Sequence, residues 1–179
     1  MKQIILVSLL LFVFSCRKDD MPIYSPGNME HGSINACRNG KNWEASGAAY
    51  KYAERDSIFG ISFDTYTYDG ILRETGGINE IPLQLGKYTV WRNSYGGGFK
   101  EKTIGSYFTI TSDGDVLEDV YHIDEDCKNY VKVTKLDTVA NKVAGCFELH
   151  FVVEQPKGGE QNSEEVCFKK GTFEVDIVE

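Results

Sequence analysis

Apolar and polar residues alternate along most of the chain from residue 34 onward. In the stretch 58–63, for example, Phe59, Ile61 and Phe63 fall on one face and Ser62 falls on the other. A period of two is typical of a strand with one buried face, and no stretch keeps a helical period over about ten residues or more. The sequence therefore predicts a domain built from strands.

Turn signals divide this part of the chain into short segments. Asn39-Gly40 is the strongest hairpin signal, because both residue types tolerate positive φ. The stretches with strand patterns are 34–38, 41–45, 58–63, 81–91, 107–111, 131–136, 143–153, 166–168 and 172–178. The positions expected to point inward in the last strands are Val143, Gly145, Phe147, Leu149, Phe151, Val153, Phe173, Val175 and Ile177. This pattern predicts an all-β fold, a single antiparallel β-sandwich of about 8–10 strands, with an open, lipocalin-like β-barrel as the alternative.

The N-terminus has a different pattern. Lys2 precedes an apolar run over residues 4–14, which is followed by the small residue Ser15 and then by Cys16. A basic start, an apolar run and a small residue are typical of a secretory signal, and the run is shorter than the about 20 residues that a membrane-spanning helix needs. The letters VFSC before and at Cys16 resemble a bacterial lipobox. The resemblance implies that residues 1–15 are removed and that Cys16 carries lipid, which anchors the chain to a membrane.

Two basic and two acidic residues, RKDD at 17–20, follow Cys16. They resemble the acid-ending tetrads of surface-exported lipoproteins of the Bacteroidetes, which implies an outer-membrane protein displayed on the cell surface. An anchor of two or three acyl chains is effectively permanent, because each buried methylene contributes about 0.8 kcal/mol. Residues 21–33 contain Pro, Gly and Ser with little periodicity, so we expect a flexible tether over 16–33 and one domain over 34–179.

The chain is acidic, with a formal net charge of −8. Such a charge excludes binding to nucleic acid by neutralisation of its phosphates and binding to an anionic membrane by charge. Seven carboxylates are dense between residues 113 and 126: Asp113, Asp115, Glu118, Asp119, Asp124, Glu125 and Asp126. Their spacing does not fit an EF-hand, so a solvated acidic surface is favoured over a calcium site, and no metal site is predicted.

Four cysteines remain once Cys16 is committed to lipid: Cys37, Cys127, Cys146 and Cys167. An even number in an exported domain favours disulfides over four buried free thiols. Cys146 and Cys167 both fall on the outer faces of successive strands, which predicts a Cys146–Cys167 disulfide and leaves Cys37 to pair with Cys127. The chain has no C-x-x-C pair and only three scattered histidines, so a structural zinc site is not expected.

Several strand and turn motifs carry a family resemblance. They are NGKNW at 39–43, LGKYTV at 85–90, VTKLD at 133–137, VAGCFEL at 143–149 and GTFEV at 171–175. Together they resemble the DUF6252-like group of small all-β lipoproteins of the Bacteroidetes. The group is functionally uncharacterised, so the resemblance implies location and architecture but no reaction. Cys146 stands where a threonine or serine is expected, which supports a disulfide in this chain.

The sequence predicts no enzyme and no cofactor, because it contains no G-x-S-x-G, H-E-x-x-H or phosphate-binding G-x-x-x-x-G-K motif. The stretch WRNSYGGGF at 91–99 joins Trp91, Arg92, Asn93 and Tyr95 to a glycine-rich turn, and these four residues are the candidate ligand-binding surface. The alternative is that Trp91 belongs to the core. Two functions follow: a non-catalytic binding or adhesion module, with glycan as the candidate ligand, or an accessory envelope protein that acts through protein–protein contacts.

Overall fold

The computed structural model describes residues 21–53, 55–93, 102–156 and 162–178. Within these ranges the chain forms strands and no helix, and hence no helix long and apolar enough to span a membrane. The strands are β1 Gly32–Arg38, β2 Lys41–Tyr52, β3 Arg55–Tyr66, β4 Leu72–Pro82, β5 Gly86–Thr89, β6 Trp91–Arg92, β7 Ile104–Ile110, β8 Leu117–Ile123, β9 Tyr130–Asp137, β10 Lys142–Pro156 and β11 Glu165–Val178. The predicted all-β class is confirmed.

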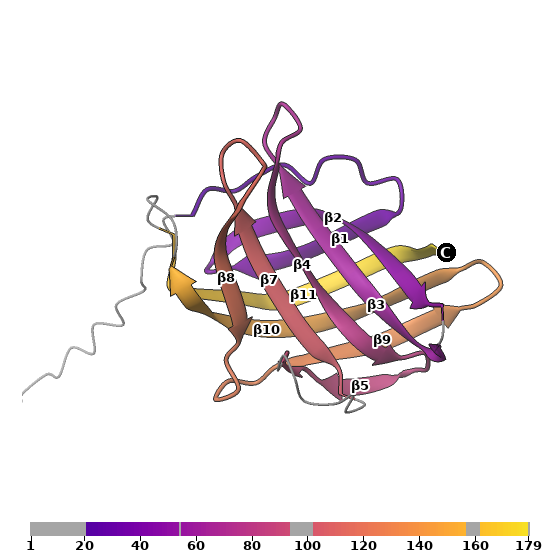
Figure 1. The fold of residues 1–179 in the computed structure, drawn as a ribbon. Coiled ribbons are helices and arrows are strands. Elements are labelled where there is room, and N and C mark those ends of the chain that lie inside the picture. Colours follow the sequence, from indigo (N-terminus) through magenta and orange to yellow (C-terminus); the bar gives the residue numbers. More distant parts are fainter. Residues whose placement is uncertain (1–20, 54, 94–101, 157–161, 179) are drawn as a thin grey trace, which may run out of the picture.

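All 11 strands belong to one sheet that folds back over itself. Hydrogen-bonded pairs lead from β1 through β2, β3, β4, β7, β8, β10 and β11, and β11 pairs with β1 again. β9 pairs with the first half of β10, and β5 continues from β9. In Figure 1, β3, β4, β7 and β8 cross over β1, β2, β10 and β11, so the predicted sandwich-like arrangement has two facing layers.

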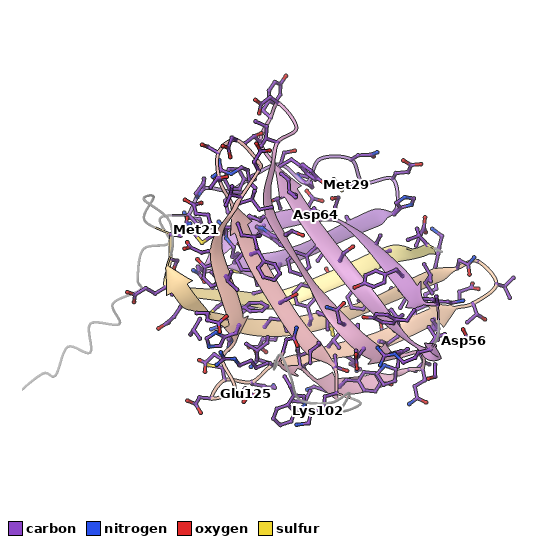
Figure 2. The ribbon with its side chains drawn as sticks, in the orientation of Figure 1. Met21, Met29, Asp56, Asp64, Lys102 and Glu125 are labelled. Atoms are coloured by element: carbon purple, nitrogen blue, oxygen red, sulfur yellow. The ribbon has the colours of Figure 1, made fainter. Side chains whose placement is uncertain are left out.

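Residues 21–31, expected to be part of a flexible tether, instead pack against the domain along the upper edge of the view in Figure 2. Met21 is only 2% exposed, and the Arg38 guanidinium donates to the carbonyl oxygens of Met21 at 3.2 Å and Pro22 at 2.7 Å. Ser25 and Tyr66 exchange two backbone hydrogen bonds of 2.8 and 2.7 Å. The packed domain therefore includes residues 21–31, because this segment finds partners for both its side chains and its backbone.

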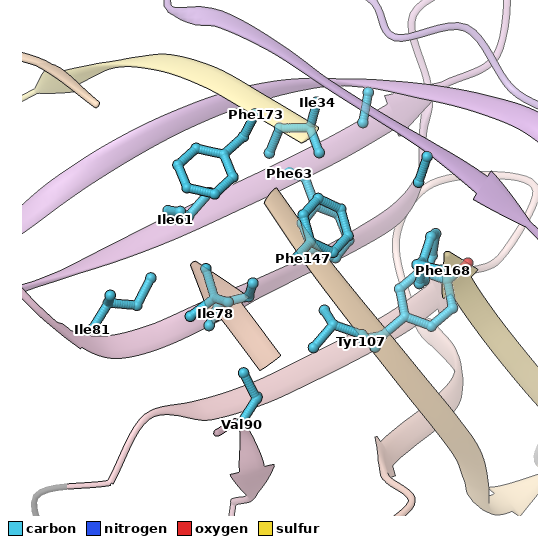
Figure 3. Packing of buried hydrophobic residues seen from close by; sticks show 14 of the residues in the cluster. Ile34, Ile61, Phe63, Ile78, Ile81, Val90, Tyr107, Phe147, Phe168 and Phe173 are labelled. Atoms are coloured by element: carbon cyan, nitrogen blue, oxygen red, sulfur yellow. The ribbon is translucent and has the colours of Figure 1, made fainter. Parts of the chain in front are cut away.

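The core lies between the two layers and is built from the alternating positions of the strands (Figure 3). The residues expected to point inward on β3, Phe59, Ile61 and Phe63, are 3% exposed or less. Tyr107 and Phe168 meet near the centre with ring centroids 5.4 Å apart. Most inward positions predicted on β10 and β11 are also buried, namely Val143, Phe147, Leu149, Phe151, Phe173, Val175 and Ile177, whereas Gly145 and Val153 are only half-buried.

A charged pair lies inside this core. Glu74 and Arg38 have fully buried side chains and form an ion pair. The Glu74 carboxylate also accepts hydrogen bonds from Trp43 Nε1 at 3.0 Å, the Thr65 hydroxyl at 2.7 Å and the Tyr107 hydroxyl at 2.9 Å. A buried carboxylate is tolerable only when it is paired and hydrogen-bonded, and here four donors satisfy it. Burial beside this carboxylate also raises the pKa of the Tyr107 hydroxyl.

One sequence-based strand prediction is wrong in detail, and two strands were missed. The stretch 81–91 is not one strand, because β4 ends at Pro82, which has no N–H for the sheet, and the chain then turns into β5 and β6. β4 and β8 were not predicted. Both carry buried charged residues that hide the apolar alternation, including Glu74 on β4 and Glu118 and Asp119 on β8. Glu118 and Asp119 are 6% and 3% exposed, so they do not belong to a solvated acidic surface.

The four cysteines of the described chain are free thiols, so neither predicted disulfide is formed. On the β10–β11 ladder Cys146 lies opposite Thr172, whereas Cys167 lies opposite His150. Four residues along a strand separate the two thiols by about 13 Å, well beyond the about 7 Å limit between bridged Cα atoms. The prediction failed because two outward-facing positions on successive strands do not fix the register, and the register of β10 and β11 sets Cys167 opposite His150 instead of Cys146.

Candidate functional site

A cavity of about 1000 Å³ opens at the lower edge of the sheet, on the side where Figure 2 labels Asp56 and Lys102. Its walls come from the start of β3 at residues 55–58, the end of β4 with the loop after it at 80–84, and β5 at 87–89. Trp91 and residues 102–103 complete the lining. Segments far apart in the sequence therefore meet at this site.

The cavity exists because β5 leaves the strand that precedes it. β4 pairs with β3 as far as Pro82, which faces Ile58, but β5 pairs with β9 on the other side. The gap between them is framed by backbone hydrogen bonds. Leu83 N donates to Ser57 O at 2.8 Å, and Trp91 N donates to Thr103 O at 2.9 Å. These bonds fix the rim of the cavity on the rigid sheet.

Glu80 has an unusual backbone in the wall of the cavity. Its φ is 58°, in the left-handed region that non-glycine residues rarely adopt. Such a conformation costs about 1–3 kcal/mol, and residues of this kind cluster at functional sites. Two contacts hold Glu80 in place: its carboxylate accepts from Arg55 Nη2 at 2.8 Å, and its carbonyl accepts from the Thr103 hydroxyl at 3.1 Å.

Trp91 supplies an exposed aromatic ring to the cavity. Its side chain is 38% exposed, and the ammonium of Lys102 lies 4.4 Å from the centroid of its ring. A second lining lysine, Lys87, has its ammonium 3.9 Å from the ring centroid of Tyr130. An exposed tryptophan beside hydrogen-bond donors is the combination that binding sites for polar ligands with apolar faces use.

Of the site residues predicted from the sequence, Trp91 lines the cavity, whereas Arg92 and Asn93 do not. Trp91 lies on the cavity wall and is exposed, so the alternative that it belongs to the core is wrong; Trp43, at 2% exposure, is the core tryptophan. Arg92 lies outside the lining and is held by Glu125 and Glu154, with its guanidinium 3.1 Å from the Glu154 carboxylate. Asn93 is half-buried and also outside the lining.

Two predicted residues, Tyr95 and Cys16, lie outside the described part of the chain. The lining residues that sequence reasoning missed include the charged residues Arg55, Glu80, Lys87 and Lys102. No local motif marks these four residues. Only the strand register brings them to one place, and the unusual backbone of Glu80 is visible only in three dimensions.

The thiols of Cys127 and Cys167 are poor candidates for nucleophilic chemistry. A hydrogen bond to the Asp124 carboxylate at 3.1 Å is the main cause that raises the pKa of the Cys127 thiol to about 11. Burial raises the pKa of the Cys167 thiol as well. Since the thiolate is the reactive form, both groups stay protonated and unreactive at neutral pH. Within the described ranges no group of three or more His, Cys, Asp and Glu side chains is arranged to hold a metal ion.

Comparison with protein-family models, with curated proteins and with solved structures gives no match for this chain. The functional argument therefore starts from the cavity itself.

Proposed function

We propose that this protein is a lipid-anchored binding protein of the outer-membrane surface, which holds a glycan in the cavity beside Trp91 and does not transform it. The observation that carries the proposal is the exposed Trp91 ring on the wall of a cavity of about 1000 Å³. Sugar rings have apolar faces that stack on aromatic rings, and their hydroxyls bond to polar side chains. Arg55, Asp56 and Gln84 line the same cavity and offer both donors and acceptors.

The anchoring half of the proposal rests on the N-terminal sequence. The apolar run over residues 4–14, the lipobox-like VFSC and the tetrad RKDD support lipidation at Cys16 and display on the cell surface. Changing Cys16 to alanine should release soluble protein. Intact cells that express the native protein should lose it to an external protease; protection from that protease would contradict surface display.

The binding half is tested with a glycan array. The soluble Cys16→Ala protein should give specific hits that disappear in Trp91→Ala. The matched control is Tyr68→Ala, which removes an exposed aromatic ring from the β3–β4 loop, outside the cavity lining, and should keep every hit. An array without hits, or hits that survive Trp91→Ala, would contradict the proposed site.

An accessory envelope protein is the second candidate function. β5 ends the chain of hydrogen-bonded strands and has only β9 as a neighbour among the described strands, so its other edge can accept a strand of a partner protein. A silent glycan array together with crosslinks from β5 to another envelope protein would favour this function.

A further inference from the structure

The lining of the cavity differs in charge from the rest of the molecule. The chain as a whole carries −8, whereas the described lining residues include three cations, Arg55, Lys87 and Lys102, against two carboxylates, Asp56 and Glu80. The three cations come from β3, from β5 and from the residue pair before β7, so the fold gathers them. A chain with an excess of acids places a local excess of bases at this cavity.

The two carboxylates, Asp56 and Glu80, leave an excess of one positive charge among the charged lining residues. The Glu80 carboxylate forms an ion pair with Arg55, in which Oε1 lies 2.8 Å from Nη2. Among the residues that the structure describes, no carboxylate lies within ion-pair distance of Lys87 or Lys102, and both ammonium groups instead lie over aromatic rings. Outside the cavity lining, Arg92 is paired with Glu154 and Lys142 with Asp176. The two lysines therefore keep their hydrogen-bonding capacity for a ligand.

From these contacts we infer that the ligand is an acidic saccharide, one that carries carboxylate or sulfate groups. This inference rests on the proposed function and names the ligand class of the same cavity. The Lys87 and Lys102 ammoniums are the donors available to the acid group of the ligand, and charge-assisted hydrogen bonds are stronger than bonds between neutral groups. A sugar ring stacks on Trp91, beside which Lys102 is already placed. The negative charge of the rest of the molecule is largely screened beyond about 8 Å at physiological salt.

The test is a glycan array in which uronate-containing, sialylated and sulfated glycans are each paired with their neutral parent, followed by titration of the best pair with soluble Cys16→Ala protein. We expect the acidic member to bind about tenfold more tightly than its parent and to lose this preference at high salt. Lys87→Gln and Lys102→Gln should each weaken binding of the acidic glycan several-fold and weaken binding of the neutral parent less, so that the preference for the acidic member shrinks. The control is Lys142→Gln, since Lys142 is paired with Asp176 outside the cavity lining.

The outcomes separate this inference from the proposed function. If neutral glycans bind as tightly as acidic ones and Trp91→Ala abolishes both, the glycan site stands and the acidic ligand is refuted. If an acidic glycan binds but the two lysine variants bind it equally well, the inference is refuted too. If no glycan binds, the proposed function and the inference fall together. Urea unfolding of each variant checks that the substitutions leave the fold intact.

Discussion

Replacing Glu74 with glutamine should destabilise the domain more than any other change of a single charge to an amide. The new side chain keeps the size of the old one but loses the charge that balances Arg38, whose side chain is fully buried. In the native protein each carboxylate oxygen accepts two hydrogen bonds: Oε1 from Arg38 and Tyr107, and Oε2 from Trp43 and Thr65. In whichever orientation the glutamine lies, its NH₂ group faces two donors and cannot accept from them.

The size of this effect follows from these contacts. Breaking a buried ion pair by removal of one partner costs about 3–5 kcal/mol, and a buried donor without an acceptor costs about 1–3 kcal/mol. These costs describe overlapping contacts, so we expect Glu74→Gln to lower the free energy of unfolding by about 3–5 kcal/mol. Urea denaturation followed by tryptophan fluorescence measures the change. The buried Trp43 donates to Glu74 and is a direct reporter of this region.

The matched control is Glu44→Gln, which makes the same chemical change on an exposed position of β2 and should alter stability by less than about 0.5 kcal/mol. A loss below about 1 kcal/mol for Glu74→Gln would refute the reasoning, because it would mean that Arg38 finds another counter-charge or that water reaches the pair.

The other predictions concern tryptophan packing, thiol pairing and pH. Trp43→Ala should cost about 3–5 kcal/mol of stability and Trp91→Ala less than about 1 kcal/mol, because only the first ring is in the core; equal losses in urea unfolding would contradict this. Non-reducing peptide mapping should find no Cys146–Cys167 disulfide, since the register holds these residues apart. Burial lowers the pKa of His150 below its ordinary 6.5, so the unfolded chain binds more protons at mildly acidic pH, and stability should fall as pH drops below 6.5. The fall should be smaller in His150→Gln, and an unchanged pH profile would contradict the assignment.

Local patterns predicted much of the sheet. Asn39-Gly40 forms the expected hairpin, with φ of 45° and 89° at its two residues, because positive φ at both positions is a local requirement that the sequence displays. Phe59, Ile61 and Phe63 are buried as their alternation indicates. β4 was missed because Glu74 faces inward, and nothing near it in the sequence shows that Arg38 is its partner.

The candidate site was only partly predictable for the same reason. Trp91 stands out in the sequence as a large aromatic beside a glycine-rich turn, and the structure puts it on the cavity wall. Arg55, Glu80 and Lys102 look like ordinary surface residues until the register of β3, β4 and β7 brings their segments together. The disulfide prediction failed on the register of β10 and β11, which no local pattern displays and which sets Cys167 opposite His150.

The docked N-terminal segment has a consequence for how the protein would stand on a cell. Only four residues separate Cys16 from Met21, and Met21 is held in the domain by Arg38. Five extended residues span at most about 18 Å, so a lipid on Cys16 would keep the domain close to the bilayer and let it present only a narrow range of faces. In Figure 2 Met21 lies at the left of the view, whereas Asp56 and Lys102, which line the cavity, lie at the lower right and at the bottom, so the cavity would not open at the point where the anchor joins the domain. If Cys16 carries lipid, as we propose, this short linker would restrict the orientation of the domain on the membrane. The cavity would then bind only those ligands that come close to the cell surface.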